Sequence, residues 1–222
     1  MSAIVIGASG GIGSALADAL AGRGPVVRLS RSSGDLDLLN ETTVAAAAER
    51  LRAQAPFDRI IVAAGLLHDA AQSPERSLRD LSADHLARSF AVNAIGPALC
   101  AAHFLSLLSP DGRFAALSAR VGSISDNRLG GWYGYRGSKA ALNQLIRTAA
   151  IELTRTRPQA VCVTLHPGTV DTAMSQPFQR GVAADKLFTP AFSAERLLAV
   201  LDGLSPADSG NCFDWAGERV PF

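Results

Sequence analysis

Lysine, cysteine and an excess of charge of one sign are all scarce in this 222-residue sequence. Lysine occurs only at Lys139 and Lys186, and 21 basic residues face 20 acidic ones, which gives a formal net charge of +1. A chain without a single-sign charge excess is not expected to bind nucleic acid or an anionic membrane. Hydrophobic residues make up 48% of the chain, and this composition excludes intrinsic disorder.

The cysteines and histidines form no disulfide or metal-binding pattern. Cys100, Cys162 and Cys212 lie far apart with no CxxC pair, and the four histidines show no HxxxH or HExxH spacing. We therefore expect buried free thiols and no metal site. No secretory leader precedes the first apolar run, and no uncharged apolar run reaches about eighteen residues, so we expect a cytoplasmic protein without a membrane partner.

Short apolar runs alternate with longer stretches of helical periodicity along the whole chain. This alternation predicts a single α/β domain over residues 1–222, a Rossmann-type, doubly wound parallel sheet with helices on both faces. The segment from Met174 to Pro190 is irregular, and we expect it to form a mobile flap. The expected strands are Ala3–Ile6, Val26–Leu29, Arg59–Ala63, Arg113–Leu117, Val161–Leu165 and Cys212–Trp215. The expected helices are Ile12–Leu20, Glu41–Ala55, Ser82–Leu108, Tyr135–Thr156 and Ala194–Leu201.

A glycine-rich turn separates the first strand from the first helix. Glycine permits positive φ and a close approach of the backbone to a phosphate, and the helix N-terminus that follows offers free N–H groups. The spacing is GxxxGxG and no GK[ST] follows, which excludes an ATP-type P-loop. The turn indicates a dinucleotide site, and a tight turn without a ligand remains the alternative on this motif alone. Its candidate cofactor-binding residues are Gly7, Ser9, Gly10, Gly11, Ile12 and Gly13.

The end of the second strand bears on which dinucleotide is bound. An NAD site needs a carboxylate there for the ribose hydroxyls, whereas an NADP site needs a cation for the 2′-phosphate. This chain has Ser30, Arg31 and Ser32 there and no acid before Asp35. Because an arginine pairs well with a phosphate, NADP(H) is the predicted cofactor, with a solvated loop arginine as the alternative.

Tyr135 and Lys139 are four residues apart on a predicted helix, so they share one face. A phenol with an ordinary pKa of about 10 is a poor acid–base catalyst near neutral pH. A nearby ammonium is expected to lower that pKa by favouring the phenolate. An isolated pair of this kind is usually a surface pair, but here it follows a dinucleotide-binding turn.

Together these motifs resemble the short-chain dehydrogenase/reductase family over nearly the whole chain. The stretch from Gly122 to Lys139 and the compact C-terminal end are similar to the C-factor and sniffer-type carbonyl reductases of that family. The matching segments are Gly7/Gly11/Gly13, Ala63-Ala64-Gly65, Asn93, Tyr135/Lys139 and Pro167-Gly168-Thr169-Val170-Asp171-Thr172.

The resemblance implies a role for each matching residue. Tyr135 would be the general acid, Lys139 would lower its pKa and bind the nicotinamide ribose, and Asn93 would complete a proton relay. Pro97 cannot donate to the Asn93 carbonyl, which predicts a kinked helix with that carbonyl free; a kink without a relay is the alternative. The implied cofactor contacts are Asp37 and Leu38 at the adenine, Ala63, Ala64 and Gly65 at the adenosine ribose, and Pro167, Gly168, Val170 and Thr172 at the nicotinamide.

Three departures from the family pattern stand out. Ile6 replaces the usual threonine, and alanines at 63 and 64 replace an asparagine. The third departure concerns catalysis, because Ala119 occupies the position of the family's catalytic serine. Ser123, twelve residues before Tyr135, is the best substitute by spacing, and Ser118 is the second candidate.

The sequence therefore predicts an NADPH-dependent reductase that converts a small carbonyl compound to an alcohol. The alternative is a non-enzymatic NADP(H)-binding sensor or signalling protein on the same fold, which the missing serine favours. Epimerase or dehydratase chemistry is weaker, because those relatives have a larger C-terminal substrate region. The two long helices resemble those the family uses to form dimers or tetramers. Trp132, Met174, Phe178 and Phe188 would line an apolar substrate pocket or belong to ordinary packing.

Overall fold

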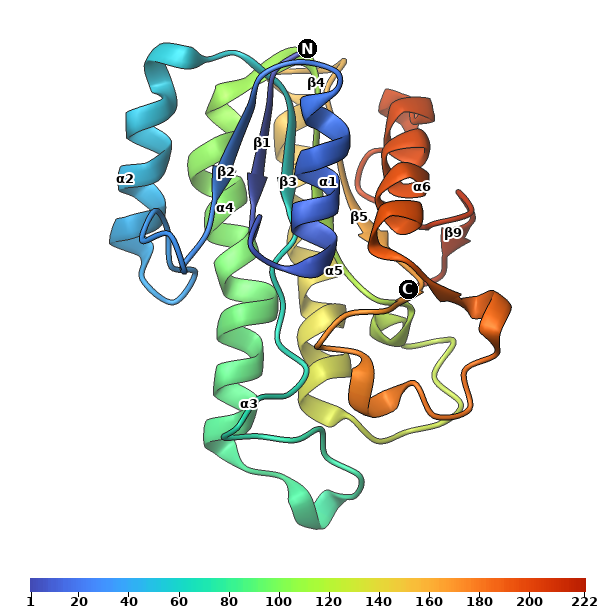
Figure 1. Ribbon diagram of the computed structural model, residues 1–222. Helices are drawn as coiled ribbons and strands as arrows, with labels where there is room; N and C mark the ends of the chain where they lie inside the picture. Colours follow the sequence, from blue (N-terminus) through green and yellow to red (C-terminus); the bar gives the residue numbers. More distant parts are fainter.

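A seven-stranded sheet with the order β2-β1-β3-β4-β5-β8-β9 forms the centre of the computed structural model, which describes residues 1–222 (Figure 1). All neighbouring strands are parallel except the last pair, β8 and β9. This confirms the predicted doubly wound α/β fold. The strands are β1 Ala3–Ile6, β2 Val26–Leu29, β3 Phe57–Val62, β4 Leu108–Leu117, β5 Val161–His166, β8 Cys212–Asp214 and β9 Arg219–Val220.

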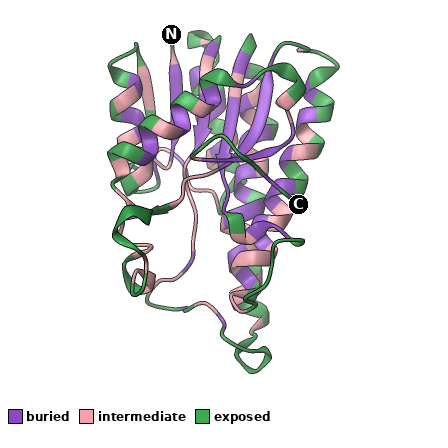
Figure 2. Cartoon of the chain, turned by 90° about the vertical axis from the view of Figure 1, so that its right-hand side faces the viewer, coloured by how far each residue is buried: buried purple, intermediate pink, exposed green.

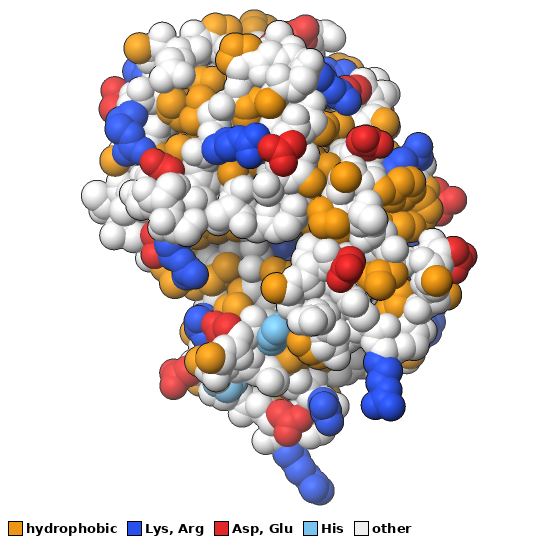
Figure 3. Space-filling view, in the orientation of Figure 1, with side chains coloured by type: hydrophobic (Ala, Val, Ile, Leu, Met, Phe, Trp, Pro, Cys, Tyr) orange, Lys and Arg blue, Asp and Glu red, His pale blue; other side chains and the backbone are white.

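Helices cover both faces of this sheet, as its two-sided burial requires (Figure 2). On the face of the molecule shown in Figure 3, basic and acidic side chains are interspersed. Side chains of β1 alternate between the two cores: Ala3 and Val5 pack on one side, Ile4 and Ile6 on the other. The face of Val5 is covered by α1 Gly11–Ala21 and α6 Pro190–Gly203, and the face of Ile4 by α2 Glu41–Leu51, α4 Gly96–Phe104 and α5 Tyr133–Thr154.

The strand order reverses at β1, which lies between β2 and β3. A crevice forms outside the carboxyl ends of the strands at such a switch point. The two loops that leave it are in close contact, because a Cβ at Gly7 would lie 2.9 Å from the backbone carbon of Ala63 and from the Ala64 nitrogen. The Ala63 amide donates to the Ile6 carbonyl at 2.7 Å, so backbone contacts join loops that lack the family's usual polar side chains.

The expected helix Ser82–Leu108 is a series of segments rather than one regular helix. It runs as α3 Ala83–Phe90, a π-helical turn Ala91–Ile95 and α4. The Gly96 amide donates to the Ala91 carbonyl, five residues back, just before Pro97. Because Pro97 has no N–H, the predicted irregularity at Asn93 takes the form of a π-bulge rather than a simple kink.

Residues Ala83–Leu107 form a helix long and apolar enough to cross a membrane by length and composition alone, with a mean hydropathy of 1.5. Ala94, Cys100, Ala101 and Phe104 of this stretch belong to the hydrophobic core of the sheet. The apolar composition is therefore explained by packing against strands.

Several strands differ from the prediction. β9 was not predicted, and β4 begins at Leu108 rather than Arg113. The segment expected to be irregular contributes β7 Leu187–Phe188, which pairs with β6 Thr169–Val170 in a separate small sheet. Strands of two or three residues are too short for hydrophobic periodicity to detect.

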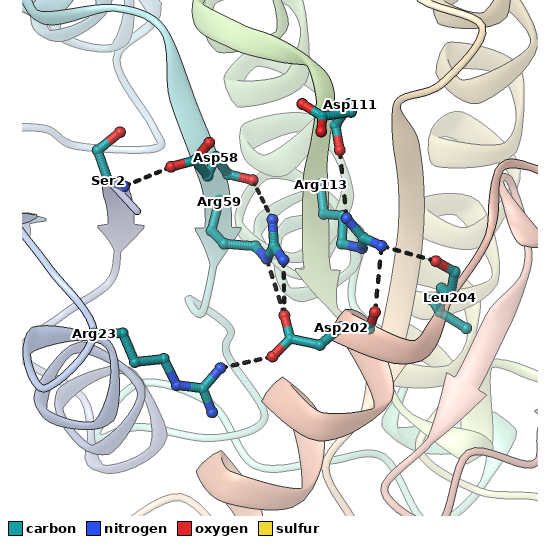
Figure 4. A network of polar contacts seen from close by, with 8 residues as sticks. All are labelled: Ser2, Arg23, Asp58, Arg59, Asp111, Arg113, Asp202 and Leu204. Atoms are coloured by element: carbon teal, nitrogen blue, oxygen red, sulfur yellow. Dashed lines mark hydrogen bonds and ion pairs between the residues drawn. The ribbon is translucent and has the colours of Figure 1, made fainter.

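An ionic network holds the amino ends of the strands together, at the end of the sheet opposite the crevice (Figure 4). The Asp202 carboxylate of α6 accepts hydrogen bonds from Arg23 at 2.6 Å and from Arg59 at 2.8 Å. Arg113 donates to the carbonyls of Asp202 and Leu204. Burial would raise the pKa of Asp202, but the hydrogen bonds and charges of Arg59 and Arg23 outweigh it, so the pKa is lowered. The network connects the loop after α1, β3, β4 and α6 in the folded chain.

Candidate active site

A pocket of about 510 Å³ lies at the carboxyl ends of β1, β2 and β3. Its volume lies in the range typical of small-molecule sites. Most of the predicted cofactor-binding residues surround it: Gly7, Ser9, Gly10, Gly11, Ile12, Ser30, Arg31, Ser32, Asp37, Leu38, Ala63, Ala64, Gly65 and Thr172. The predicted cofactor-binding residues that do not line it are Gly13, Tyr135, Lys139, Pro167, Gly168 and Val170, and the catalytic candidates Asn93 and Ser123 do not line it either. Gly13 lies under the turn, Pro167 and Gly168 lie in the loop after β5, and Val170 lies in β6.

The glycine-rich turn presents backbone donors to this pocket. Gly10 precedes α1 in an extended conformation and provides no side-chain cap, so the first amides of the helix have no partner in the chain. Gly7 adopts a φ of +88°. A Cβ at Gly11 would lie 2.8 Å from Thr172 Cγ2, so the wall of the pocket has no room for a side chain there. Free amides at a helix N-terminus in a glycine-lined crevice fit the pyrophosphate of a dinucleotide.

A hydroxyl and guanidinium cluster lies at the end of β2. Ser30 Oγ is hydrogen-bonded to Ser32 Oγ at 3.1 Å and to Ser33 Oγ at 2.6 Å. Arg31 is exposed at the rim, and its guanidinium forms no hydrogen bond or ion pair with the rest of the chain. The Asp35 carboxylate, the nearest acid in sequence, is hydrogen-bonded to Ser33. The cation at this position is therefore available to an anionic ligand.

Lys139 and Asn93 lie behind Gly65, a residue of the pocket wall. A Cβ at Gly65 would lie 3.4 Å from Asn93 Oδ1 and 3.6 Å from Lys139 Nζ. Asn93 forms a pair of hydrogen bonds with the backbone of Leu66, at 2.7 and 2.8 Å, and donates to Ser138 Oγ at 3.1 Å. Lys139 Nζ donates to the Leu117 carbonyl at 2.8 Å. Both polar groups are buried and fixed at the pocket by hydrogen bonds.

Tyr135 lies one helical turn before Lys139, and the Lys139 ammonium is 5.8 Å from the centre of its ring. Contrary to the expectation that Lys139 lowers the pKa of Tyr135, desolvation of the phenol raises that pKa to about 12. Burial alone accounts for this rise, and Lys139 Nζ bonds to the Leu117 carbonyl rather than to the phenol. Burial also lowers the pKa of Lys139 to about 8. The Tyr135 hydroxyl itself has no hydrogen-bond partner within the chain.

The two candidate serines have different surroundings. Ser118 donates to Asn143 Oδ1 at 2.7 Å, an oxygen that also accepts from Thr164 at 3.0 Å, so its proton is used inside the fold. Ser123 accepts a hydrogen bond from the Asp126 amide at 3.1 Å and keeps its own proton free. Ala119, at the family's serine position, is nearly buried at 8% exposure.

Aromatic side chains gather beside Tyr135. Its ring meets Trp132 edge to face at 6.2 Å between centroids, Trp132 meets Phe178 at 5.2 Å, and Phe178 meets His68 at 5.4 Å. His68 Nε2 is bonded to the Met174 carbonyl at 3.0 Å. Of the four residues suggested for an apolar substrate pocket, Trp132 and Phe178 form an aromatic wall beside Tyr135, and Met174 alone lines the pocket.

Phe188 is not part of this wall. It packs on Trp215 at 4.5 Å and on Phe192 at 4.9 Å instead.

Sequence reasoning missed part of the pocket lining. Arg88 and Val92 lie four residues apart on one side of the helical stretch before Asn93, and Arg88 is paired with Asp69. Helical spacing relates Arg88 to Val92, but only the fold brings Asp69 to them. The lining residues not anticipated as cofactor or substrate contacts are Ile6, Leu36, Leu39, Leu66, His68, Asp69, Arg88, Val92 and Ala173.

Comparison with known proteins agrees with this geometry. A family model described as short chain dehydrogenase matches residues 1–183. The chain is 39% identical to C-signal of Myxococcus xanthus over 149 residues, which cover 66% of this chain and 84% of that protein. The NADPH-bound carbonyl reductase from chicken fatty liver has a TM-score of 0.82 and 25% identity, covering 100% of this chain and 98% of its own. Carbonyl reductase Sniffer of D. melanogaster shares the fold, with a TM-score of 0.84 at 19% identity over 100% and 99% of the two chains.

The family match extends over the glycine-rich turn, the pocket at the switch point and the helix of Tyr135 and Lys139. It therefore includes nearly every element that the geometry brings together around the pocket. On this basis, the protein belongs to the short-chain dehydrogenase family of oxidoreductases.

Proposed function

We propose that the protein is an NADPH-dependent carbonyl reductase. The observation that supports this most directly is the convergence of Lys139 Nζ and Asn93 Oδ1 beside Gly65 at the pocket wall, with Tyr135 one helical turn away. A cation and an amide held behind the pocket wall, with a phenol one helical turn away, suit proton transfer to a bound carbonyl oxygen.

When bound, the nicotinamide supplies the hydride that reduces the carbonyl carbon. Tyr135 donates its proton to the carbonyl oxygen, and Lys139 holds the cofactor ribose and provides positive charge behind the phenol. Desolvation raises the pKa of Tyr135 to about 12, so the phenol carries the proton that the carbonyl oxygen takes up. Asn93 fixes the loop at Leu66 that forms the floor of the site.

Preference for NADPH over NADH is assigned to Arg31. Replacing Arg31 by alanine is expected to weaken NADPH binding about 10- to 100-fold and to leave NADH binding nearly unchanged, because a hydrogen-bonded charge pair with the 2′-phosphate contributes about 1.5–3 kcal/mol. Cofactor fluorescence titration measures both affinities. Arg28→Ala, which removes a surface arginine paired with Asp18, is the matched control. An equal loss for both cofactors would contradict the assignment.

The hydroxyl that replaces the family serine is assigned to Ser123. Ser123→Ala is expected to lower kcat about 100-fold, because a donor to the developing oxyanion is lost. Ser118→Ala should instead lower the melting temperature with little effect on kcat, since its hydroxyl bonds to Asn143. If kcat falls only in the Ser118 variant, the two roles are reversed.

The function as a whole is tested by titration with NADPH and NADH, followed by a panel of aldehydes, ketones and quinones. Turnover of any carbonyl compound with NADPH supports the reductase. Tight NADPH binding without turnover across the panel would favour the sensor, for which Ala119 is the specific observation.

Self-association is also proposed, since Ile95, Leu145 and Ile151 leave 41–53% of their surfaces exposed on the two long helices.

A further inference from the structure

A buried carboxylate from a distant loop lies at the start of α5. Glu75, in the loop between β3 and α3, is only 4% exposed, and it takes part in no ion pair. Its Oε2 accepts a hydrogen bond from the Gly134 amide at 3.1 Å. Its backbone carbonyl accepts from the Trp132 amide at 2.5 Å. One residue thus binds two amides, those of Trp132 and Gly134, just before Tyr135.

The sequence of α5 explains why an outside carboxylate is needed. The residue before the helix is Trp132, whose side chain has no acceptor and which adopts a left-handed backbone with a φ of +53°. A helix of 22 residues therefore starts without a cap of its own. Glu75, 59 residues earlier, takes that place, and the partial positive charge of the helix N-terminus compensates its burial.

The surroundings leave this carboxylate little freedom. A Cβ at Gly134 would lie 2.9 Å from Glu75 Oε1, 3.1 Å from Ser89 Oγ and 3.4 Å from Leu86 Cδ2. Ser89 in turn accepts a hydrogen bond from Gln72 at 3.0 Å. The loop of Glu75 and helix α3 therefore close over the first turn of α5, and only glycine fits between them.

We infer that Glu75 is a positioning residue for Tyr135, an inference that rests on the proposed reductase function. Tyr135 directly follows Gly134, and its hydroxyl has no hydrogen bond within the chain. The direction of the phenol is therefore set by the backbone of the first helical turn and by the Trp132 ring against it, at 6.2 Å. Glu75 binds the amides of Trp132 and Gly134, three residues and one residue before the phenol, so it fixes the phenol without touching a substrate or cofactor.

The test replaces Glu75 by alanine and by glutamine. Glu75→Ala is expected to lower kcat about 100-fold, because a misplacement of about 1 Å has that effect on an aligned reaction. The dissociation constant for NADPH should stay within about twofold, because the pocket does not include Glu75. Glu75→Gln keeps an oxygen acceptor for the Gly134 amide and should restore most of kcat. A loss of kcat that glutamine restores would not arise from a general loss of stability.

Asp80→Ala is the matched control in the same loop. The Asp80 carboxylate accepts from the amides of Arg76 and Ser77, both at 2.9 Å, but it caps a short turn that does not contact α5. Its removal should leave kcat unchanged. If Glu75→Ala fails to fold, Gly134→Ala provides the second test, because its Cβ displaces the carboxylate and is expected to lower kcat similarly.

The outcomes separate this inference from the proposed function. Tyr135→Phe, assayed alongside, reports on the tyrosine chemistry alone. If it is inactive while a folded Glu75→Ala or Gly134→Ala keeps wild-type kcat, the inference is overturned and the reductase stands. If the wild type turns over no carbonyl compound, Trp132 fluorescence in a Trp215→Phe background still tests the contact: Glu75→Ala should shift it, and an unchanged spectrum would refute the positioning role.

Discussion

Replacement of Tyr135 by phenylalanine is expected to lower kcat about 1,000-fold while NADPH binds as in the wild type, because a positioned general acid contributes about 10²- to 10⁴-fold. The phenol oxygen has no hydrogen-bond partner in the chain, so its removal leaves no buried group unpaired and should not destabilise the fold. Stopped-flow or steady-state oxidation of NADPH, together with a fluorescence titration, measures both effects.

The chain provides its own control, because its only other tyrosine, Tyr133, lies two residues earlier on the same helix. Tyr133 is 37% exposed and makes no contact that the proposed chemistry uses. Tyr133→Phe should retain full activity. Turnover that persists in Tyr135→Phe would exclude the tyrosine as the proton donor. The raised pKa of its phenol would then play no part in catalysis.

Gly13→Ala is expected to destabilise the protein by about 3 kcal/mol or more and to abolish NADPH binding. A Cβ at Gly13 would lie 2.2 Å from the Gly7 carbonyl oxygen, a contact with backbone that no rotamer relieves. Overpacking of this kind typically costs about 1–3 kcal/mol and more where the neighbour cannot move. In a chain of this length, this corresponds to a melting temperature lower by roughly 6–12 °C. Thermal unfolding with and without NADPH measures both consequences.

Gly22→Ala is the matched control at the other end of α1. Its φ of −70° suits any residue, and a Cβ there would meet nothing nearer than the Ala19 carbonyl oxygen at 3.6 Å. It should keep both stability and affinity for NADPH. If Gly13→Ala melted like the wild type, the close packing of the turn against α1 would not be required for the fold.

The order of strands and helices and the glycine-rich turn could be predicted from sequence, because each depends on periodicity or on local backbone chemistry. The first strand, the turn and Ile12–Leu20 lie where expected, since buried β-branched residues, glycines and a helix follow each other without a gap. Even the irregularity at Asn93 could be predicted, because Pro97 removes one donor at a fixed distance along the chain.

The rest depended on contacts between distant residues. No sequence pattern around Glu75 indicates a function. Its role follows only from the fold, which places its carboxylate beside the amide of Gly134, 59 residues later. The pKa of Tyr135 was misjudged for a related reason: spacing placed Lys139 on the same face but did not show that the Leu117 carbonyl takes up its ammonium. The division between Ser118 and Ser123 likewise required knowledge of Asn143, a partner from another element.

The ionic network around Asp202 and the dinucleotide crevice lie at opposite ends of the same strands. This arrangement separates the stability of the fold from the binding of a ligand, two properties that are often in conflict. Residues at one end of β3 and β4 strengthen the fold, whereas the other end keeps amides and small residues free for a ligand. Amide hydrogen exchange along a single strand should therefore be slowest near Arg59 and respond to NADPH only beyond Val62. Selection for heat resistance and selection for new substrates can act on this chain at separate ends of one sheet, each without altering the other.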